Sequence, residues 1–375
     1  MIDFNVPYLS QNEMKDIRKV IGNRKFQGNG PFSKKTEKYL SGLTGSSKIL
    51  LTSSGTQALD MSALLIDIKR NDEVVMPSYT FSSTANAFIL RGAKIKFIDV
   101  HPGTMNMNEN LIEDAITDKT KAIVPVHYAG VSCDMDKVNS IARAYQLKVI
   151  EDAAQGISAY YKERSLGSIG DAGIYSFHET KNIHCGEGGA ILINNKDYYD
   201  KSDVIMEKGT NRAKFIRREI NHYNWVALGS SFLVNEITAA FLYSQLGDVN
   251  KVTKKRLNLW NYYYDNLKEI EGIDLPYVPP YSKHNAHIFY IKTKNKEIRE
   301  KLRLFLWRNG IDSRTHFIPL HSSPYGLKNT KFIGKDEYTT QEANRLLRLP
   351  MHYYLTNADI DYIIKIIADF YKNHL

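Results

Sequence analysis

The sequence predicts an α/β fold with a mostly parallel sheet, followed by a smaller α+β domain. Between about residues 45 and 195, short apolar runs alternate with segments of helical spacing, which is typical of strand–helix–strand units. After about residue 250 this alternation stops, and long helices and a Pro-rich break replace it. We therefore predict a large domain over residues 1–249, which includes the N-terminal segment, and a small C-terminal domain over residues 250–375.

Five apolar runs are the strand candidates of the large domain. They are Lys48–Thr52, Val74–Met76, Ile95–Val100, Ala122–His127 and Lys148–Glu151. Helical spacing follows the first run over Gln57–Ile68, and Asp134 is an N-cap candidate for a helix with apolar residues at i, i+3, i+4 and i+7 from Val138. Strands alternating with helices predict a parallel sheet covered by helices on both faces.

The second half of the chain has its own pattern of elements. We predict a long helix over Asn250–Ile270, a strand over His287–Thr293, and a helix over Lys296–Asn309 that ends at the C′ glycine Gly310. The run from Thr356 to Asp359 resembles a capping box that opens a last helix through Asn373.

Composition narrows the class of protein. The chain of 375 residues is 43% hydrophobic and 24% charged, as in ordinary globular proteins. Its two cysteines, Cys133 and Cys185, have no CxxC spacing, and no HExxH or Cys/His cluster occurs, so we expect no disulfide framework and no metal. The N-terminus has no signal-peptide pattern, and no apolar run approaches the ~20 residues needed to span a bilayer. We expect a cytoplasmic protein without a membrane partner.

The formal net charge of +9 raises the alternative of nucleic-acid binding. The basic residues are scattered, however, and the cluster from Lys251 to Arg256 lies on the predicted long helix, where a solvated face explains it. A modest positive field also suits an anionic small substrate such as a nucleotide diphosphate. We expect no nucleic-acid partner.

The segment from Ser176 to Gly189 is the most informative of the chain. It places Lys181 in a glycine-punctuated turn after an expected strand. A desolvated lysine in such a turn can form an imine with a carbonyl, provided that its amine is neutral. The alternative is an ordinary surface lysine, so the interpretation depends on the rest of the site.

Three other segments supply matching parts. Gly55 and Thr56 form a turn at a helix N-terminus, which suits a phosphate and equally an ordinary helix cap. Phe81 follows a strand end, where an aromatic ring can lie on a heterocycle or in the core. Asp152 ends a buried strand, where it can keep a ring nitrogen protonated or cap a helix. Together with Lys181 these parts match pyridoxal 5′-phosphate.

The order of these motifs resembles the sugar aminotransferases of the DegT/DnrJ/EryC1 family over essentially the whole chain. Within that family the resemblance is closest to the branch of bacterial dTDP-4-amino-4,6-dideoxygalactose transaminases. The stretches that carry this closeness are Met76–Phe81, Val124–Gly130, Glu207–Arg212 and Asn285–Ile291. The resemblance implies the type I fold of pyridoxal-phosphate-dependent aminotransferases and a homodimer with shared active sites.

The resemblance also implies roles at matching positions. Lys181 would form the imine and move the proton, and Asp152 would pair with the pyridine nitrogen. Phe81 would stack on the ring, and Gln155 would lie near its 3-oxygen. The phosphate would be held by Gly55, Thr56 and Ser176. Many relatives have Gly-x-Asn-x-Arg, whose Asn reaches the partner's cofactor phosphate. Here Ser231 stands at that position in Gly229–Leu233.

The activity implied is transfer of an amino group from L-glutamate to C4 of a nucleotide-linked 4-keto-6-deoxyhexose, with dTDP as the expected nucleotide and surface glycans as the pathway. A 3-aminotransferase or a gluco-configured product is the alternative on the same scaffold, and a non-catalytic regulator is a further one. A dehydratase branch has histidine in place of the lysine, so Lys181 argues against it. His316 and His321 are candidates for the sugar pocket, and His184–Cys185 leaves specificity open.

Overall fold

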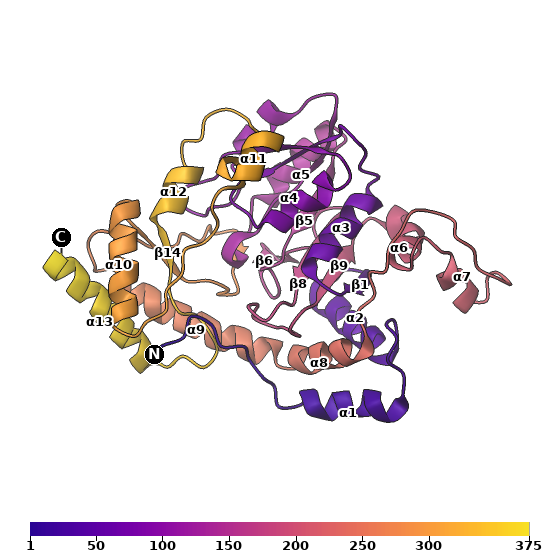
Figure 1. Cartoon of the computed structure of the whole chain (residues 1–375), viewed down its shortest axis with the longest axis horizontal. Helices are drawn as coiled ribbons and strands as arrows, with labels where there is room; N and C mark the ends of the chain where they lie inside the picture. The colour runs from indigo at the N-terminus through magenta and orange to yellow at the C-terminus, as the bar shows by residue number, and fades with distance from the viewer. Residues whose placement is uncertain (375) are drawn as a thin grey trace.

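The computed structural model describes residues 1–374, and its largest element is a mixed sheet packed between helices (Figure 1). In sheet order the strands are β1 (Lys48–Thr52), β9 (Gly189–Ile193), β8 (Ala172–Ser176), β5 (Lys148–Asp152), β4 (Thr120–Ile123), β2 (Glu73–Pro77), β3 (Lys94–Ile98) and β13 (Lys331–Phe332). Neighbouring strands from β8 to β13 are parallel, whereas β9 runs antiparallel to β1 and to β8. The predicted, mostly parallel sheet is confirmed.

Successive residues of each strand enter two different cores, one on each face of the sheet. Ile49 and Leu51 of β1 lie in the first core, and Leu50 between them lies in the second. Val75 and Val74 of β2 divide in the same way, as the two-residue period of a strand requires. Both faces are therefore buried, which explains why the strands read as continuous apolar runs.

Helices cover both faces of this sheet. The first core contains residues of α1 (Glu13–Asn23), α2 (Pro31–Thr44), α5 (Met135–Ala144) and α8 (Glu236–Leu246). The second contains residues of α3 (Gly55–Leu65), α4 (Ser82–Ile89) and α6 (Tyr199–Met206). The short α7 (Arg212–Ile216) projects beyond α6 at the right of Figure 1. Short 3-10 turns occur at Glu109–Leu111, Glu113–Ala115, Tyr128–Gly130, Lys196–Tyr198 and Leu320–Ser322.

The element boundaries agree with the sequence to within a few residues, with informative exceptions. Asp134 caps α5 as predicted, since its Oδ1 accepts a hydrogen bond of 3.2 Å from Lys137 N–H. Strand β4 ends at Ile123 and not at His127, because Pro125 has no N–H to give to a sheet ladder. The helix expected over Gln57–Ile68 spans Gly55–Leu65.

The C-terminal part has a third core of its own. It contains residues of α9 (Val249–Leu267), α10 (Lys296–Arg308) and α13 (Asn357–His374), and of β12 (Tyr290–Thr293) and β14 (Leu346–Arg348). The remaining elements are β10 (Ile273–Asp274), α11 (Pro324–Asn329) and α12 (Thr339–Arg345), and a small sheet of β11 (Ser282–Lys283), β6 (Tyr160–Tyr161) and β7 (Arg164–Ser165). A separate core agrees with a small domain, although β13 of this region extends the large sheet. The boundary at residue 249 stays a prediction.

Two local expectations for this region are confirmed, and one strand is shorter than expected. Thr356 and Asp359 exchange the hydrogen bonds of a capping box, with Asp359 N–H donating to Thr356 Oγ1 at 3.2 Å. Gly310 has a φ of 76°, as a C′ glycine should. The strand expected over His287–Thr293 begins only at Tyr290. Among the described residues, no helix is long and apolar enough to cross a membrane.

Candidate active site

A cavity of about 680 Å³ opens where strands β1, β2, β5 and β8 end. Its volume lies within the range of small-molecule sites, about 300–1,000 Å³. Carboxyl ends of parallel strands are the usual place for ligands in α/β sheets. The cavity walls include most of the residues that the sequence singled out, namely Gly55, Thr56, Phe81, Asp152, Gln155, Ser176, Lys181 and His316.

One end of the cavity is the N-terminus of α3. Ser54 caps this helix, its Oγ accepting a hydrogen bond of 3.1 Å from Gln57 N–H. The free N–H groups and the positive end of the helix dipole make such a terminus an anion site. Gly55 brings the backbone close to Ser176, since a Cβ at Gly55 would meet Ser176 Cβ at 2.9 Å. Thr56 Oγ1 lies 2.8 Å from Ser83 Oγ, which adds hydroxyl groups to the same cradle.

Asp152 supplies the carboxylate of the cavity. The residue is the last of β5 and is only 6% exposed. Its Oδ2 accepts a hydrogen bond of 2.7 Å from Thr84 Oγ1, and its Oδ1 accepts one of 3.1 Å from Ala154 N–H. Two donors hold the carboxylate in a fixed orientation at the cavity wall.

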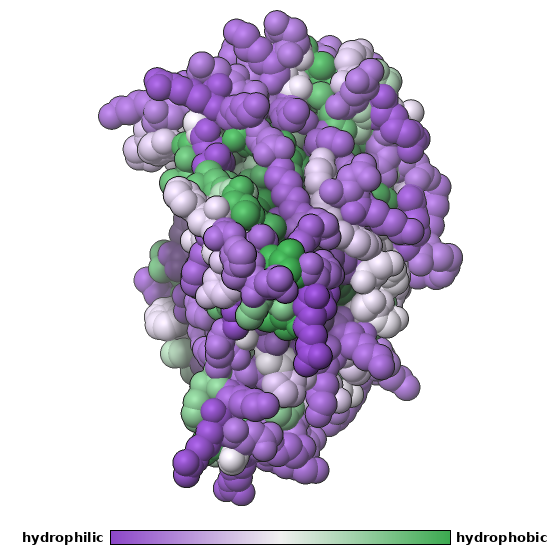
Figure 2. All heavy atoms as spheres, turned by 90° about the vertical axis from the view of Figure 1, so that its right-hand side faces the viewer, coloured by the Kyte–Doolittle hydropathy of each residue, from purple (hydrophilic) through white to green (hydrophobic). Residues whose placement is uncertain are grey.

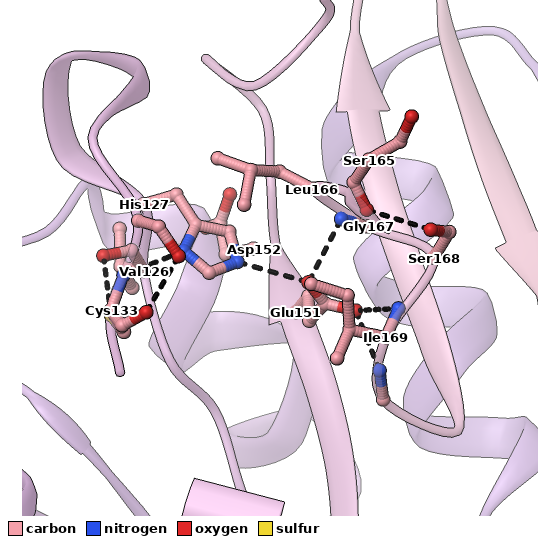
Figure 3. Close-up of polar contacts among 12 residues, drawn as sticks. Val126, His127, Cys133, Glu151, Asp152, Ser165, Leu166, Gly167, Ser168 and Ile169 are labelled. Carbon is pink, nitrogen blue, oxygen red and sulfur yellow. Dashed lines mark hydrogen bonds and ion pairs between the residues drawn. The ribbon is translucent and has the colours of Figure 1, made fainter. Parts of the chain in front are cut away.

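Glu151, the residue before Asp152, is anchored on the opposite side of the strand (Figure 3). Its carboxylate lies 3.0 Å from His127 Nε2, and both residues are fully buried. Because His127 Nδ1 accepts from Cys133 N–H, Nε2 carries the ring proton and donates it to Glu151. Three backbone N–H groups, of Gly167, Ile169 and Gly170, also donate to Glu151. This cluster fixes the end of β5, because His127 N–H donates to the carbonyl of Asp152.

Lys181 lies in the turn after β8, as predicted. Burial lowers the pKa of its amine to about 8, the nearby Asp152 carboxylate acts in the opposite sense, and the Arg348 guanidinium lowers it further. A lysine with this pKa has a substantial neutral fraction near physiological pH, whereas an ordinary lysine is almost wholly charged. The neutral amine is the form that attacks a carbonyl.

Phe81 and Gln155 occupy the walls between these groups. Phe81 is the N-cap residue of α4 and is 61% exposed, and its ring centroid lies 6.2 Å from that of Phe317. An exposed ring on a cavity wall is free to cover a flat ligand. Gln155 Oε1 accepts a hydrogen bond of 2.6 Å from Ala129 N–H, which fixes the orientation of its amide group at the cavity wall.

The structure separates the two candidate histidines. His316 lines the cavity and its Nδ1 lies 2.9 Å from Tyr128 Oη. His321 lies outside the cavity walls, between Ser78 Oγ at 2.7 Å and Asp336 at 3.0 Å, so it does not line the pocket as the sequence suggested.

Three other positions also lie away from the walls. Exposed Ser231 forms an isolated bridge with Glu207 and is not part of this chain's own cavity. His184 is 4% exposed with Nε2 at 2.7 Å from the carbonyl of Tyr8, and neither it nor Cys185 faces the cavity. His184 and Cys185, where the sequence left the sugar specificity open, therefore do not touch a substrate in this cavity directly.

Among the cavity residues that were not predicted from the sequence, Thr84, His287 and Arg348 bear most on the chemistry of the site. Thr84 lies one helical turn after Thr80, and nothing in the sequence marks it as different from any other threonine on a helix. His287 lies at 8% exposure with Nδ1 at 3.0 Å from Asn182 Oδ1. Arg348 had a usable signal, because it is a single charge within the apolar run Leu346–Leu349.

Comparison with known proteins assigns the family. Residues 7–368 match the DegT/DnrJ/EryC1/StrS aminotransferase family. The chain belongs to this family. It is 33% identical to an uncharacterised protein of Methanocaldococcus jannaschii over 88% of both chains. It is 30% identical to the spore coat polysaccharide biosynthesis protein SpsC of Bacillus subtilis, over 99% of this chain and 97% of that protein.

A solved structure extends this result to the fold. DesV of S. venezuelae, whose structure holds a ketimine intermediate, superposes with a TM-score of 0.90 over 99% of both chains at 25% identity. The type I aminotransferase fold predicted from the sequence is confirmed, as is the assignment of an aminotransferase that depends on pyridoxal phosphate.

The residues of the cavity fit that cofactor. A Cβ at Gly55 would clash with Ser176, so glycine lets the backbone of the helix N-terminus and Ser176 come together in one cradle. A phosphate end, a buried carboxylate and a lysine of lowered pKa are the groups that pyridoxal phosphate requires. When bound, the cofactor supplies an electron sink and a carrier for the amino group.

Proposed function

We propose that this aminotransferase moves an amino group from L-glutamate to C4 of a nucleotide-linked 4-keto-6-deoxyhexose, with dTDP as the nucleotide. The observation that carries the proposal is that Lys181, Asp152 and the helix N-terminus at Gly55 line one and the same cavity. The motifs from Met76 to Phe81 and from Asn285 to Ile291, which resemble the 4-amino-4,6-dideoxygalactose branch, support the sugar class. The similarity to a protein of spore coat polysaccharide biosynthesis supports a role in surface glycans.

Each residue of the cavity has a part in this proposal. The Gly55–Thr56 turn and Ser176 would hold the cofactor phosphate, and Asp152 would hold a proton on the ring nitrogen. Phe81 would cover the ring, and Gln155 would lie near its 3-oxygen. In each half of the reaction, Lys181 Nζ would move a proton between the reacting carbon of the substrate and the cofactor, which its lowered pKa favours.

The proposal includes a homodimer with shared active sites. Six large apolar side chains are exposed in residues 215–228, and they are Phe215, Ile216, Tyr223, Trp225, Val226 and Leu228. Figure 2 shows the side from which α7 projects, where hydrophobic atoms lie exposed among hydrophilic ones. Exposed apolar side chains in this number mark an interaction surface. Ser231, which follows this segment, would reach the cofactor phosphate of the partner subunit.

A cytoplasmic setting belongs to the same proposal, since Cys133 and Cys185 are both free, as in reducing compartments. The test of the function is incubation of the purified protein with L-glutamate and a panel of nucleotide keto-sugars. We expect a 4-amino-4,6-dideoxyhexose of galacto configuration by NMR of the product. A 3-amino or gluco product would replace the proposed regiochemistry or configuration. Turnover that survives in Lys181→Ala would refute the mechanism.

A further inference from the structure

Arg348 is the only arginine side chain within the cavity walls, among the described residues, that has no acidic partner. Arg314, the other arginine there, pairs with Asp312 at 2.6 Å. Arg348 donates from one Nη to the carbonyl of Thr315 at 3.2 Å, and its buried Nε has no hydrogen-bond partner. A buried guanidinium with an unused donor is costly unless an anion completes it.

The position of Arg348 is fixed by strand pairing on both sides. It pairs with Tyr290 of β12 on one side and exchanges backbone hydrogen bonds of 3.1 and 2.8 Å with Arg314 on the other. The side chain of Arg348 lines the cavity, whereas that of Leu347, the residue before it, is fully buried in the third core. A rigid arginine on a strand can present its fork to a planar or tetrahedral oxyanion.

The charges around Arg348 leave it without internal compensation. The cavity carboxylate, Asp152, accepts hydrogen bonds from Thr84 and Ala154, and its charge acts on the Lys181 amine. Phe4 lies over the guanidinium at 4.7 Å from carbon to ring centroid, which stabilises the cation without satisfying its N–H donors.

We propose that Arg348 binds an oxyanion of a substrate, either a carboxylate of the amino donor or the diphosphate of the nucleotide sugar. The inference rests on the aminotransferase activity and on the proposed substrates. The chemistry is shared by both sources, because carboxylate and phosphate oxygens accept the same paired N–H donors. The two half-reactions of a transaminase use the donor and the sugar separately, so the source can be identified.

The experiment compares the cofactor-bound wild type with Arg348→Met, which keeps the packing on Phe4, and with Arg348→Lys. The matched control is Arg164→Met, an exposed arginine that pairs with Asp136 and does not line the cavity. Calorimetry measures the binding of 2-oxoglutarate and of thymidine diphosphate to each protein. We expect about tenfold to hundredfold weaker binding of one probe to Arg348→Met, a smaller loss in Arg348→Lys, and no change in the control.

Kinetics separate a binding role from a structural one. The concentration of L-glutamate at half-maximal rate should rise if 2-oxoglutarate lost affinity, and that of the keto-sugar should rise if thymidine diphosphate did. In the first case a donor without a carboxylate, such as benzylamine, should react as before. If Arg348→Met does not fold, the same measurements on Arg348→Lys decide. Unchanged binding of both probes in a variant that retains its cofactor would overturn the inference. Failure of the wild type to use L-glutamate would count against the proposed donor alone.

Discussion

Thr84 Oγ1 donates a hydrogen bond of 2.7 Å to Asp152 Oδ2 and so joins the first turn of α4 to the end of β5. Both side chains are buried at the cavity wall. The carboxylate proposed to hold the ring proton is therefore positioned by a residue from another strand–helix unit.

Removal of this donor should slow the enzyme. Thr84→Val keeps the shape of the side chain and leaves Asp152 with one donor fewer, so we expect kcat to fall about tenfold, the equivalent of one hydrogen bond to a charged group. Thr84→Ser keeps the hydroxyl and should retain most of the activity. Equal rates for the valine and serine variants would show that the hydrogen bond is not needed.

The cradle at Gly55 predicts an effect on cofactor affinity. In Gly55→Ala the added Cβ would meet Ser176 Cβ at 2.9 Å and displace Ser176, which is proposed to hold the phosphate. Overpacking of this kind costs about 1–3 kcal/mol, which corresponds to about tenfold or more in the dissociation constant of pyridoxal phosphate. The control Gly42→Ala, in the last turn of α2 with nothing within 4 Å of the new Cβ, should bind as the wild type does. Fluorescence titration of the apoprotein measures both.

The lowered pKa of Lys181 predicts the pH dependence of cofactor attachment. Since the neutral amine reacts, the rate of the absorbance change after pyridoxal phosphate is added to the apoprotein should rise with pH and level off above about 8. An ordinary lysine would give a rate that continues to rise toward 10.5. A rate that still climbs steeply above pH 9 would contradict the burial effect.

The Glu151 cluster predicts a loss of stability. Glu151→Gln places an amide among four N–H donors, those of His127, Gly167, Ile169 and Gly170. The NH2 group of the new amide must face N–H donors from which it cannot accept a hydrogen bond. We therefore expect the free energy of unfolding to fall by about 3 kcal/mol, measured in urea at fixed cofactor concentration. The surface variant Glu163→Gln, which loses only an exposed pair with Lys283, should stay within about 0.5 kcal/mol.

The exposed apolar segment predicts the assembly state. Trp225 is 78% exposed, so Trp225→Asp should leave the monomer folded and weaken the proposed dimer. Trp307, which is 50% exposed on α10, supplies the control Trp307→Asp, expected to remain dimeric. Light scattering after gel filtration gives the mass of each. A dimer that persists unchanged in Trp225→Asp would move the interface elsewhere.

Much of the fold was predictable because its signals are local. The two cores on either side of β1 follow from alternating side chains, and the caps at Asp134 and Thr356 depend on residues three positions apart. Element ends were less accurate where one residue changes the backbone, as Pro125 does at the end of β4.

The candidate site divides along the same line. Lys181, Asp152, Gly55 and Phe81 stand in motifs whose order along the chain indicates the cofactor, so the sequence alone determined the fold class and the chemistry. Only the tertiary structure decided which side chains meet. It brought Thr84 to Asp152 and Arg348 into the cavity, and it left His321 outside. The physical reason is that the end of a strand can be predicted from neighbouring residues, whereas contact between distant segments depends on how the sheets and helices pack.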